Sequence, residues 1–289
     1  MRTFTKYLSI CIIAAGLTSC EEFFSHPIDY FVETPAPSLV VNAELTPDMR
    51  ANVEVSNSTP IFAYPAIPIK WQRNATVVMF EDGVFWDTLK FVPNLGQGWF
   101  DSSFVSSKLV KANKNYSIEV NAEGFNSVTG NTNVPETVNP LSFKWVNFPT
   151  QVSVRLKPIA TGQVYLISFY SSTNNLYFRS KNPIVEFDDD DFIDFGFDEG
   201  AFEQGWIRPE RMNGQDQTVQ IEFVYGINDP HDVYLSLTVV NQDLFNYWLD
   251  LKNFDPDNPF NEPVQVQSNI IGGYGIFSAF ALSTTQIVF

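Results

Sequence analysis

The densest group of side chains that could do chemistry is an acidic run in the second half of the chain. The run covers residues 186–203, from Glu186 to Glu203, and its densest part is Asp188, Asp189, Asp190 and Asp191. Carboxylate oxygens are ligands that Ca²⁺ prefers. Phe192 and Ile193, however, occupy positions at which a twelve-residue calcium loop needs an oxygen donor and a glycine. Three interpretations stay open: a calcium site of another kind at these aspartates, a solvated loop, or a segment that docks on a basic surface.

Other residue types that carry catalysis are sparse. The two histidines, His26 and His231, have no spaced partner that would complete a metal site or a Ser-His-Asp triad. Adjacent aspartates in one loop do not supply the two carboxyl groups at a fixed separation that glycoside hydrolysis requires. We therefore expect no catalytic residues, no cofactor-binding residues and no enzymatic activity. Ca²⁺ is the one cofactor that stays open.

The N-terminal residues predict a covalent modification. Arg2 and Lys6 precede a short apolar run, and Leu17-Thr18-Ser19-Cys20 follows it. This order is typical of a secretory signal, and the run is shorter than the roughly 20 residues that span a bilayer. The tetrad resembles a bacterial lipobox, in which the cysteine is acylated and becomes the first residue of the mature protein. Residues 1–19 are thus predicted to be a lipoprotein signal peptide, and Cys20 the lipid attachment site.

The residues after Cys20 predict where the protein works. Glu21 and Glu22 resemble the acidic flank that directs lipoproteins of the Bacteroidota to the outer face of the outer membrane. Residues 20–37 contain three prolines and no periodic apolar pattern, so they predict an extended, acylated tether. We expect a protein that contacts the bilayer through its acyl chains and faces the cell exterior.

The charge of the chain excludes one class of partner. The formal net charge is −16 at pH 7, and cleavage of the signal removes Arg2 and Lys6, which brings it to −18. Because a field of this sign repels phosphate backbones, we expect no nucleic-acid partner.

Residues 38–134 follow the period-two pattern of antiparallel strands. Val53 and Val55 alternate with polar residues, as do the apolar residues from Tyr116 to Val120. Asp82-Gly83 between two apolar runs predicts a tight hairpin whose second strand covers residues 84–92. About seven short strands separated by turn residues predict an immunoglobulin-like β-sandwich.

Tyr116 has a specific predicted role in this sandwich. The segment from Val110 to Tyr116 has the spacing of a tyrosine corner, in which the hydroxyl bonds to upstream backbone and closes the corner of the sandwich. Asn113 can adopt the left-handed conformation at the position that glycine usually fills. The alternative is an ordinary core tyrosine, and neither interpretation is catalytic.

A second domain is predicted beyond a short linker. Residues 135–140 contain two prolines and no apolar face, and alternation resumes over residues 141–289. Residues 164–171 are apolar on both faces, as in a central strand, and residues 276–282 and 285–288 predict two final strands.

One helix interrupts the strands of the second domain. Over residues 242–253, apolar side chains recur at helical spacing, which predicts one amphipathic helix packed on a sheet. The fold class is therefore all-β, with two antiparallel β-sandwich domains, the second bearing this helix.

The C-terminal residues carry a resemblance to a known family. Asn258-Pro259-Phe260, Ser268-Asn269-Ile270 and the glycine-rich segment from Gly272 to Phe277 resemble the terminal signature of the family labelled domain of unknown function 4249. The residues from Leu39 to Leu45 are similar to that family's opening strand. The resemblance implies a Bacteroidota outer-membrane lipoprotein, of a kind often encoded beside TonB-dependent transporters, and it supplies no catalytic residues.

These observations lead to one functional expectation and one alternative. We expect a surface-exposed, non-enzymatic accessory or ligand-binding subunit of a TonB-dependent nutrient transporter. The alternative is a free-standing surface module that binds glycan or calcium.

Overall fold

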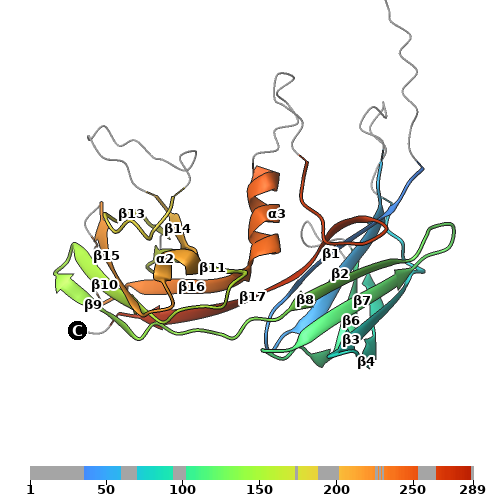
Figure 1. The fold of residues 1–289 in the computed structure, drawn as a ribbon, viewed down its shortest axis with the longest axis horizontal. Helices are drawn as coiled ribbons and strands as arrows, with labels where there is room; N and C mark the ends of the chain where they lie inside the picture. Colours follow the sequence, from blue (N-terminus) through green and yellow to red (C-terminus); the bar gives the residue numbers. More distant parts are fainter. Residues whose placement is uncertain are drawn as a thin grey trace, which may run out of the picture. The chain divides into compact units, whose positions relative to one another are not determined.

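The computed structural model describes residues 36–59, 70–93, 102–172, 175–187, 202–224, 227, 229, 231–252 and 265–287. Strands arranged in three sheets make up most of this part of the chain, which confirms the predicted all-β class (Figure 1). The helices described are α2 (Pro209–Met212) and α3 (Gln242–Lys252), and the latter confirms the predicted amphipathic helix.

The largest sheet has nine strands. Its order is β12 (Asn175–Leu176), β11 (Gln163–Tyr170), β16 (Tyr234–Asn241), β17 (Tyr274–Gln286), β1 (Leu39–Leu45), β2 (Arg50–Asn57), β6 (Ser102–Leu109) and β5 (Lys90–Pro93), and β14 (Gln204–Ile207) also pairs with β11.

The two smaller sheets have four strands each. One has the order β4 (Val84–Thr88), β3 (Thr76–Glu81), β7 (Asn115–Asn121) and β8 (Val128–Asn133). The other has the order β13 (Phe178–Arg179), β15 (Gln217–Phe223), β10 (Gln151–Leu156) and β9 (Ser142–Asn147).

Each smaller sheet shares a hydrophobic core with part of the long sheet. The first core joins apolar side chains of β1 and β2 to those of β3, β7 and β8, and includes Val41, Val53, Met79 and Ile118. The second joins β11 and β16 to β10 and β15. The alternating burial along these strands follows from the period of two, which sends successive side chains to opposite faces.

Helix α3 covers the other face of the long sheet. Leu244 and Phe245 pack against Val164, Val240 and Ile276 in a third cluster. β11 is therefore buried on both faces, as its apolar sequence predicts.

Strand β17 links the two cores. Its first half, from Tyr274 to Ala279, runs parallel to β1, and its second half, from Phe280 to Gln286, runs antiparallel to β16 (Figure 1). Phe277 and Ala279 belong to the first core, although they come from the expected second domain. Residues Pro37–Phe289 form one compact unit, and the predicted boundary at residues 135–140 stays a prediction.

Two strand boundaries differ from those expected. The segment 84–92 is two strands, because the chain crosses from β3's sheet to β6's sheet at Leu89, which is buried and bonds through its N–H to the Val77 carbonyl. The two strands expected over residues 276–282 and 285–288 are instead one long strand, β17, which ends at Gln286, and Val288 lies outside the described residues.

The local turn chemistry follows the sequence closely. Asp82 and Gly83 both have positive φ, of 51° and 79°, as a two-residue hairpin between β3 and β4 requires. Asn113 has φ of 58°, and the Tyr116 hydroxyl accepts a hydrogen bond from the Lys111 N–H at 3.1 Å. The tyrosine corner is therefore present.

Candidate functional site

The residues predicted to carry a modification or a metal are not among those described. Cys20, Glu21 and Glu22 lie outside the described residues, as do Asp188, Asp189, Asp190 and Asp191. Lipid attachment and calcium binding at these positions stay predictions. Within the described ranges, no group of three or more His, Cys, Asp or Glu side chains is placed to hold a metal ion.

The residues at the two ends of the acidic run are described, and ring contacts, a hydrogen bond and ion pairs hold them in place. The rings of Phe187 and Phe202 stack with centroids 4.3 Å apart. Glu186 accepts a hydrogen bond from Trp206 Nε1 at 3.1 Å and lies 3.2 Å from Arg208 Nε and 3.3 Å from Arg211 Nε. Both ends of the acidic run are therefore attached to the body of the protein.

The C-terminal glycine-rich segment has a structural role. A side chain at Gly273 would place Cβ 2.5 Å from the Leu39 carbonyl oxygen. At Gly275, where φ is +105°, Cβ would lie 2.1 Å from the Val41 carbonyl oxygen. These glycines let β17 approach β1 closely enough to form the parallel pair.

The preceding signature residues fix the same region through side-chain hydrogen bonds. Asn269 accepts from the Phe277 N–H and donates to the Phe277 carbonyl, both at 2.8 Å. Asp243, at the start of α3, accepts from Asn269 Nδ2 at 2.6 Å and from Ser278 Oγ at 2.7 Å. The signature therefore ties β17 to helix α3.

Next to this junction is an open pocket, which we refer to as the acidic pocket. It has a volume of about 320 Å³ and lies among β1, β2, β17 and helix α3. Its lining residues are Asn42, Ala43, Glu44, Asn52, Glu54, Tyr247 and Ile276. Asn42 lies opposite Glu54 in the β1–β2 pair and opposite Ile276 in the β1–β17 pair, so rigid strands supply most of the lining.

The carboxyl groups of the acidic pocket differ in their surroundings. Glu44 accepts a hydrogen bond from Trp248 Nε1 of α3 at 2.9 Å. Burial, and secondly the charge of Glu44, raise the pKa of Glu54 above its usual range. Burial and both carboxylates likewise raise the pKa of the Tyr247 hydroxyl. A cationic group placed in this pocket would relieve the repulsion between the carboxylates.

This arrangement can bind a ligand, and its groups suit recognition. Carboxylate oxygens accept, the tyrosine hydroxyl donates, and the amides of Asn42 and Asn52 can do both. Polar groups that converge on one space are typical of sites that orient a ligand.

Sequence reasoning did not find Glu44 and Glu54. Period two places each on the outward face of its strand, and Glu44 lies in the opening strand of the family signature. Their proximity depends on the pairing of β1 with β2 and on the position of α3, which periodicity alone does not reveal.

No described helix has both the length and the apolar character required to cross a bilayer.

The fold and the site define an all-β protein with a polar pocket beside a glycine-dependent strand junction. The chain belongs to the family described as Domain of unknown function (DUF4249), whose model matches residues 25–286. This confirms the resemblance found in the sequence. No curated protein gives a significant match.

Comparison with solved structures adds no argument about fold. A chimeric titin Z1Z2-Z1Z2 tandem is 13% identical, covers 88% of this chain and 98% of its own, and superimposes with a TM-score of 0.19. The Fcho1 Mu homology domain from Danio rerio, with a bound Eps15 peptide, is 10% identical, covers 88% and 97%, and has a TM-score of 0.21.

Proposed function

We propose that this chain is a non-enzymatic, ligand-binding accessory subunit of a TonB-dependent outer-membrane transporter, held at the cell surface by acyl chains on Cys20. The observation that carries the binding role is the acidic pocket, in which carboxylates, amides and a tyrosine hydroxyl face a common space. The lipobox and the acidic residues Glu21 and Glu22 support the surface location. The association with a transporter follows from what the family resemblance implies.

The chemistry of the acidic pocket supports a ligand that bears a positive charge. Glu54 has a raised pKa because of burial and the nearby Glu44, so a cation would lower the free energy of both carboxylates. A ligand that binds only the folded state also raises the melting temperature by mass action. A primary amine such as putrescine is a suitable probe of this pocket.

The transporter association is tested by purification of the tagged, acylated protein from native outer membranes in mild detergent. A barrel protein of the TonB-dependent class, recovered in stoichiometric amount, would support the proposal. Recovery of this chain alone would contradict the subunit role and favour the free-standing module.

The ligand role is tested separately by thermal unfolding in the presence of putrescine. We expect a rise in melting temperature that is lost in the double variant Glu44→Gln, Glu54→Gln. An equal rise in the double variant would show that the amine binds elsewhere.

The calcium alternative has its own measurement. A calcium site at Asp188–Asp191 predicts that CaCl₂ raises the melting temperature relative to EGTA, and that changing these aspartates to asparagine removes the effect. The glycan alternative is favoured by a different observation, which concerns the corner of the first core.

A further inference from the structure

A second hollow, which we refer to as the amide hollow, lies at the corner of the first core. Its volume is about 240 Å³, and it is lined by Gly83, Asn115, Tyr116, Ser117, Asn131, Thr132 and Asn133. None of these side chains carries a charge at neutral pH. It shares no lining residue with the acidic pocket, so an inference drawn from it does not depend on the proposed function.

Strand register explains why these side chains meet. Ser117 of β7 lies opposite Asn131 of β8, and Asn115 lies opposite Asn133. All four lie on the outward face, because the residues between them, Tyr116 and Thr132 among them, are buried. One pair of amides, Asn115 and Asn133, and one pair of a hydroxyl and an amide, Ser117 and Asn131, are thus presented side by side on the sheet.

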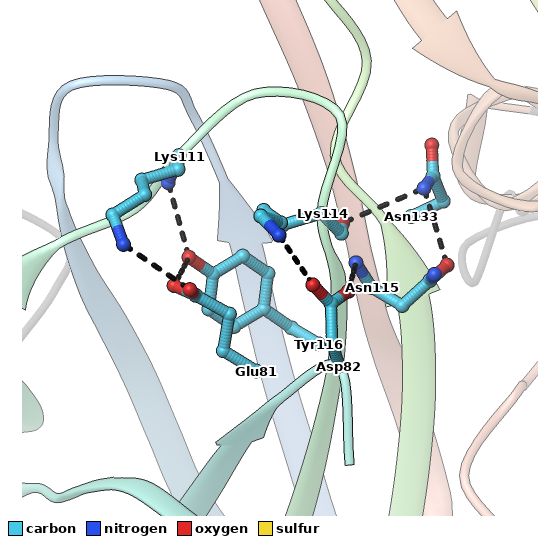
Figure 2. A network of polar contacts seen from close by, with 7 residues as sticks. All are labelled: Glu81, Asp82, Lys111, Lys114, Asn115, Tyr116 and Asn133. Carbon is cyan, nitrogen blue, oxygen red and sulfur yellow. Dashed lines mark hydrogen bonds and ion pairs between the residues drawn. The ribbon is translucent and has the colours of Figure 1, made fainter. Parts of the chain in front are cut away.

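Hydrogen bonds tie lining residues of the amide hollow to neighbouring segments. The Tyr116 hydroxyl donates to Glu81 Oε2 at 2.7 Å and accepts from the Lys111 N–H at 3.1 Å (Figure 2). Asn241 Nδ2 of β16 adds hydrogen bonds to Thr132 Oγ1 at 2.9 Å and to the Asn133 carbonyl at 2.7 Å. The backbone that positions the polar groups is therefore held from both sides.

Part of the hydrogen-bonding capacity of the hollow is unused. Asn133 Nδ2 donates to Asn115 Oδ1 at 3.1 Å and to the Lys114 carbonyl at 3.5 Å (Figure 2), and within the described residues Asn133 Oδ1 and Asn115 Nδ2 make no hydrogen bond. Within the described residues, the side chains of Ser117 and Asn131 make no hydrogen bond. Amides and hydroxyls that both donate and accept match a ligand whose groups also do both, and sugar hydroxyls have this property.

Nearby charges do not favour an ionic ligand. Lys114 Nζ lies 2.5 Å from Asp82 Oδ2, and Lys111 Nζ lies 3.1 Å from Glu81 Oε1. These charges are paired with one another beside the hollow (Figure 2). The lining therefore suits a neutral polyhydroxylated molecule better than an anion or a cation.

An aromatic surface continues from the amide hollow along the same face. Phe80 lies opposite Ser117 on one side and opposite Phe85 on the other. The two rings meet edge to face at 6.5 Å, and 60% of Phe85 is exposed. One cross-sheet row thus runs Phe85, Phe80, Ser117, Asn131. Because neighbouring strands are about 4.8 Å apart, this row spans roughly 14 Å, which accommodates more than one sugar ring.

We propose that this row is a binding site for a neutral oligosaccharide. One sugar unit lies in the amide hollow, where Asn131, Ser117 and Asn115 bond to its hydroxyls. The next unit lies over Phe80 and Phe85, whose rings pack against the apolar face of the sugar. The site binds the oligosaccharide without catalysing a reaction, because the residues that line it include no general acid or base.

The proposal is tested by calorimetric titration of the mature, acylated protein. The detergent must lack a sugar headgroup, because a maltoside would compete for the site. The probes are neutral hexasaccharides of α- and β-linked glucose, β-linked mannose and β-linked xylose, with a hexamer of galacturonate as the charged comparison. We expect at least one neutral hexasaccharide to bind and the charged hexamer to bind more weakly.

Single substitutions in the row test whether the oligosaccharide binds there. Asn131→Ala is expected to raise the dissociation constant about tenfold, and Phe85→Ala is expected to raise it several-fold. Both side chains are exposed, so unfolding curves should stay close to those of the parent protein. Thr218→Ala, an exposed change on β15 in the other small sheet, is the matched control and should leave affinity unchanged.

Two outcomes would overturn the proposal. One is the absence of binding for every neutral hexasaccharide tested. The other is binding that Asn131→Ala and Phe85→Ala leave unaltered. Neither outcome bears on the transporter association, which rests on co-purification, or on the acidic pocket, which is tested with an amine.

Discussion

Lys111 donates its backbone N–H to the hydroxyl oxygen of Tyr116, five residues further along the chain, at 3.1 Å. The same hydroxyl donates to the Glu81 carboxylate at 2.7 Å, and the Tyr116 ring lies edge to face against Trp86. A single buried side chain thus fixes the loop before β7 to the end of β3. The amide hollow is built on this connection.

Tyr116→Phe should destabilise the protein by about 2 kcal/mol, because the variant leaves the Lys111 N–H without its acceptor and Glu81 without its donor. Chemical denaturation at pH 7 measures the loss.

The Tyr116 hydroxyl is the largest cause of the lowered pKa of Glu81. A carboxyl group whose pKa is lowered in the folded state stabilises that state at pH values above its usual pKa. This stabilisation is lost as the pH falls through the lowered pKa. The difference between variant and parent should therefore shrink in acid, and a constant difference would contradict this account.

Gly275→Ala should prevent folding or cost more than about 3 kcal/mol, since Cβ would lie 2.1 Å from the Val41 carbonyl oxygen and φ is +105°. Gly162→Ala is the matched control, because φ there is +82° but nothing lies within 4 Å of the added Cβ. The control isolates backbone strain and should cost about 1 kcal/mol. Equal melting temperatures for the two variants would show that close approach to β1 is not what requires glycine.

Glu54→Gln should raise stability at neutral pH. The pKa of Glu54 is raised by burial and by Glu44, so the ionised group is disfavoured in the folded state, and protonation removes the penalty as the pH falls through the raised value. We expect a rise in melting temperature of about 2 °C at pH 7 and none in acid. Glu123→Gln, on an exposed loop, is the comparison. A lower melting temperature at pH 7 would mean that the Glu54 charge is compensated.

Asp243→Asn should loosen the junction between α3 and β17. The carboxylate accepts hydrogen bonds from Ser278 Oγ and Asn269 Nδ2 with its two oxygens. An asparagine amide has one acceptor oxygen, so it can replace only part of these hydrogen bonds. We expect a loss of about 2 kcal/mol and faster amide exchange in the segment from Asn269 to Ser278. Unchanged exchange in that segment would assign the hydrogen bonds a minor role.

Cys20→Ala should move the protein from the membrane fraction to the soluble fraction of the cell. The reason is that the acyl chains are the proposed attachment to the bilayer. Fractionation followed by mass analysis of the N-terminal peptide measures both the location and the lipid. Retention of the variant in the membrane would point to another anchor.

The features that the sequence predicted correctly are local. Asp82-Gly83 defines its turn through the φ values that the two residues tolerate, and the segment from Val110 to Tyr116 contains both the corner tyrosine and the left-handed Asn113. Helix α3 follows from the spacing of its apolar residues within one segment. Each depends on residues a few positions apart, so composition and spacing suffice.

The features that could not be predicted join distant segments. Asn42 meets Ile276 because β1 and β17 are parallel neighbours, and alternation says which side chains share a face without saying which strands are adjacent. The break at Leu89 was missed because a buried apolar residue continues the pattern across a change of sheet. Glu44, Glu54 and the row from Phe85 to Asn131 are consequences of such pairings.

The parallel pair of β1 with β17 makes the first core depend on residues that lie far apart in the chain. The first core draws most of its residues from 39–134, yet Phe277 and Ala279 complete it from near the other end of the chain. Contacts between segments so far apart in sequence are expected to slow folding, because the long loop between them must close before they form. A chain truncated before residue 274 would leave one edge of β1 unpaired, and an unpaired edge can pair with a strand of another molecule and lead to aggregation.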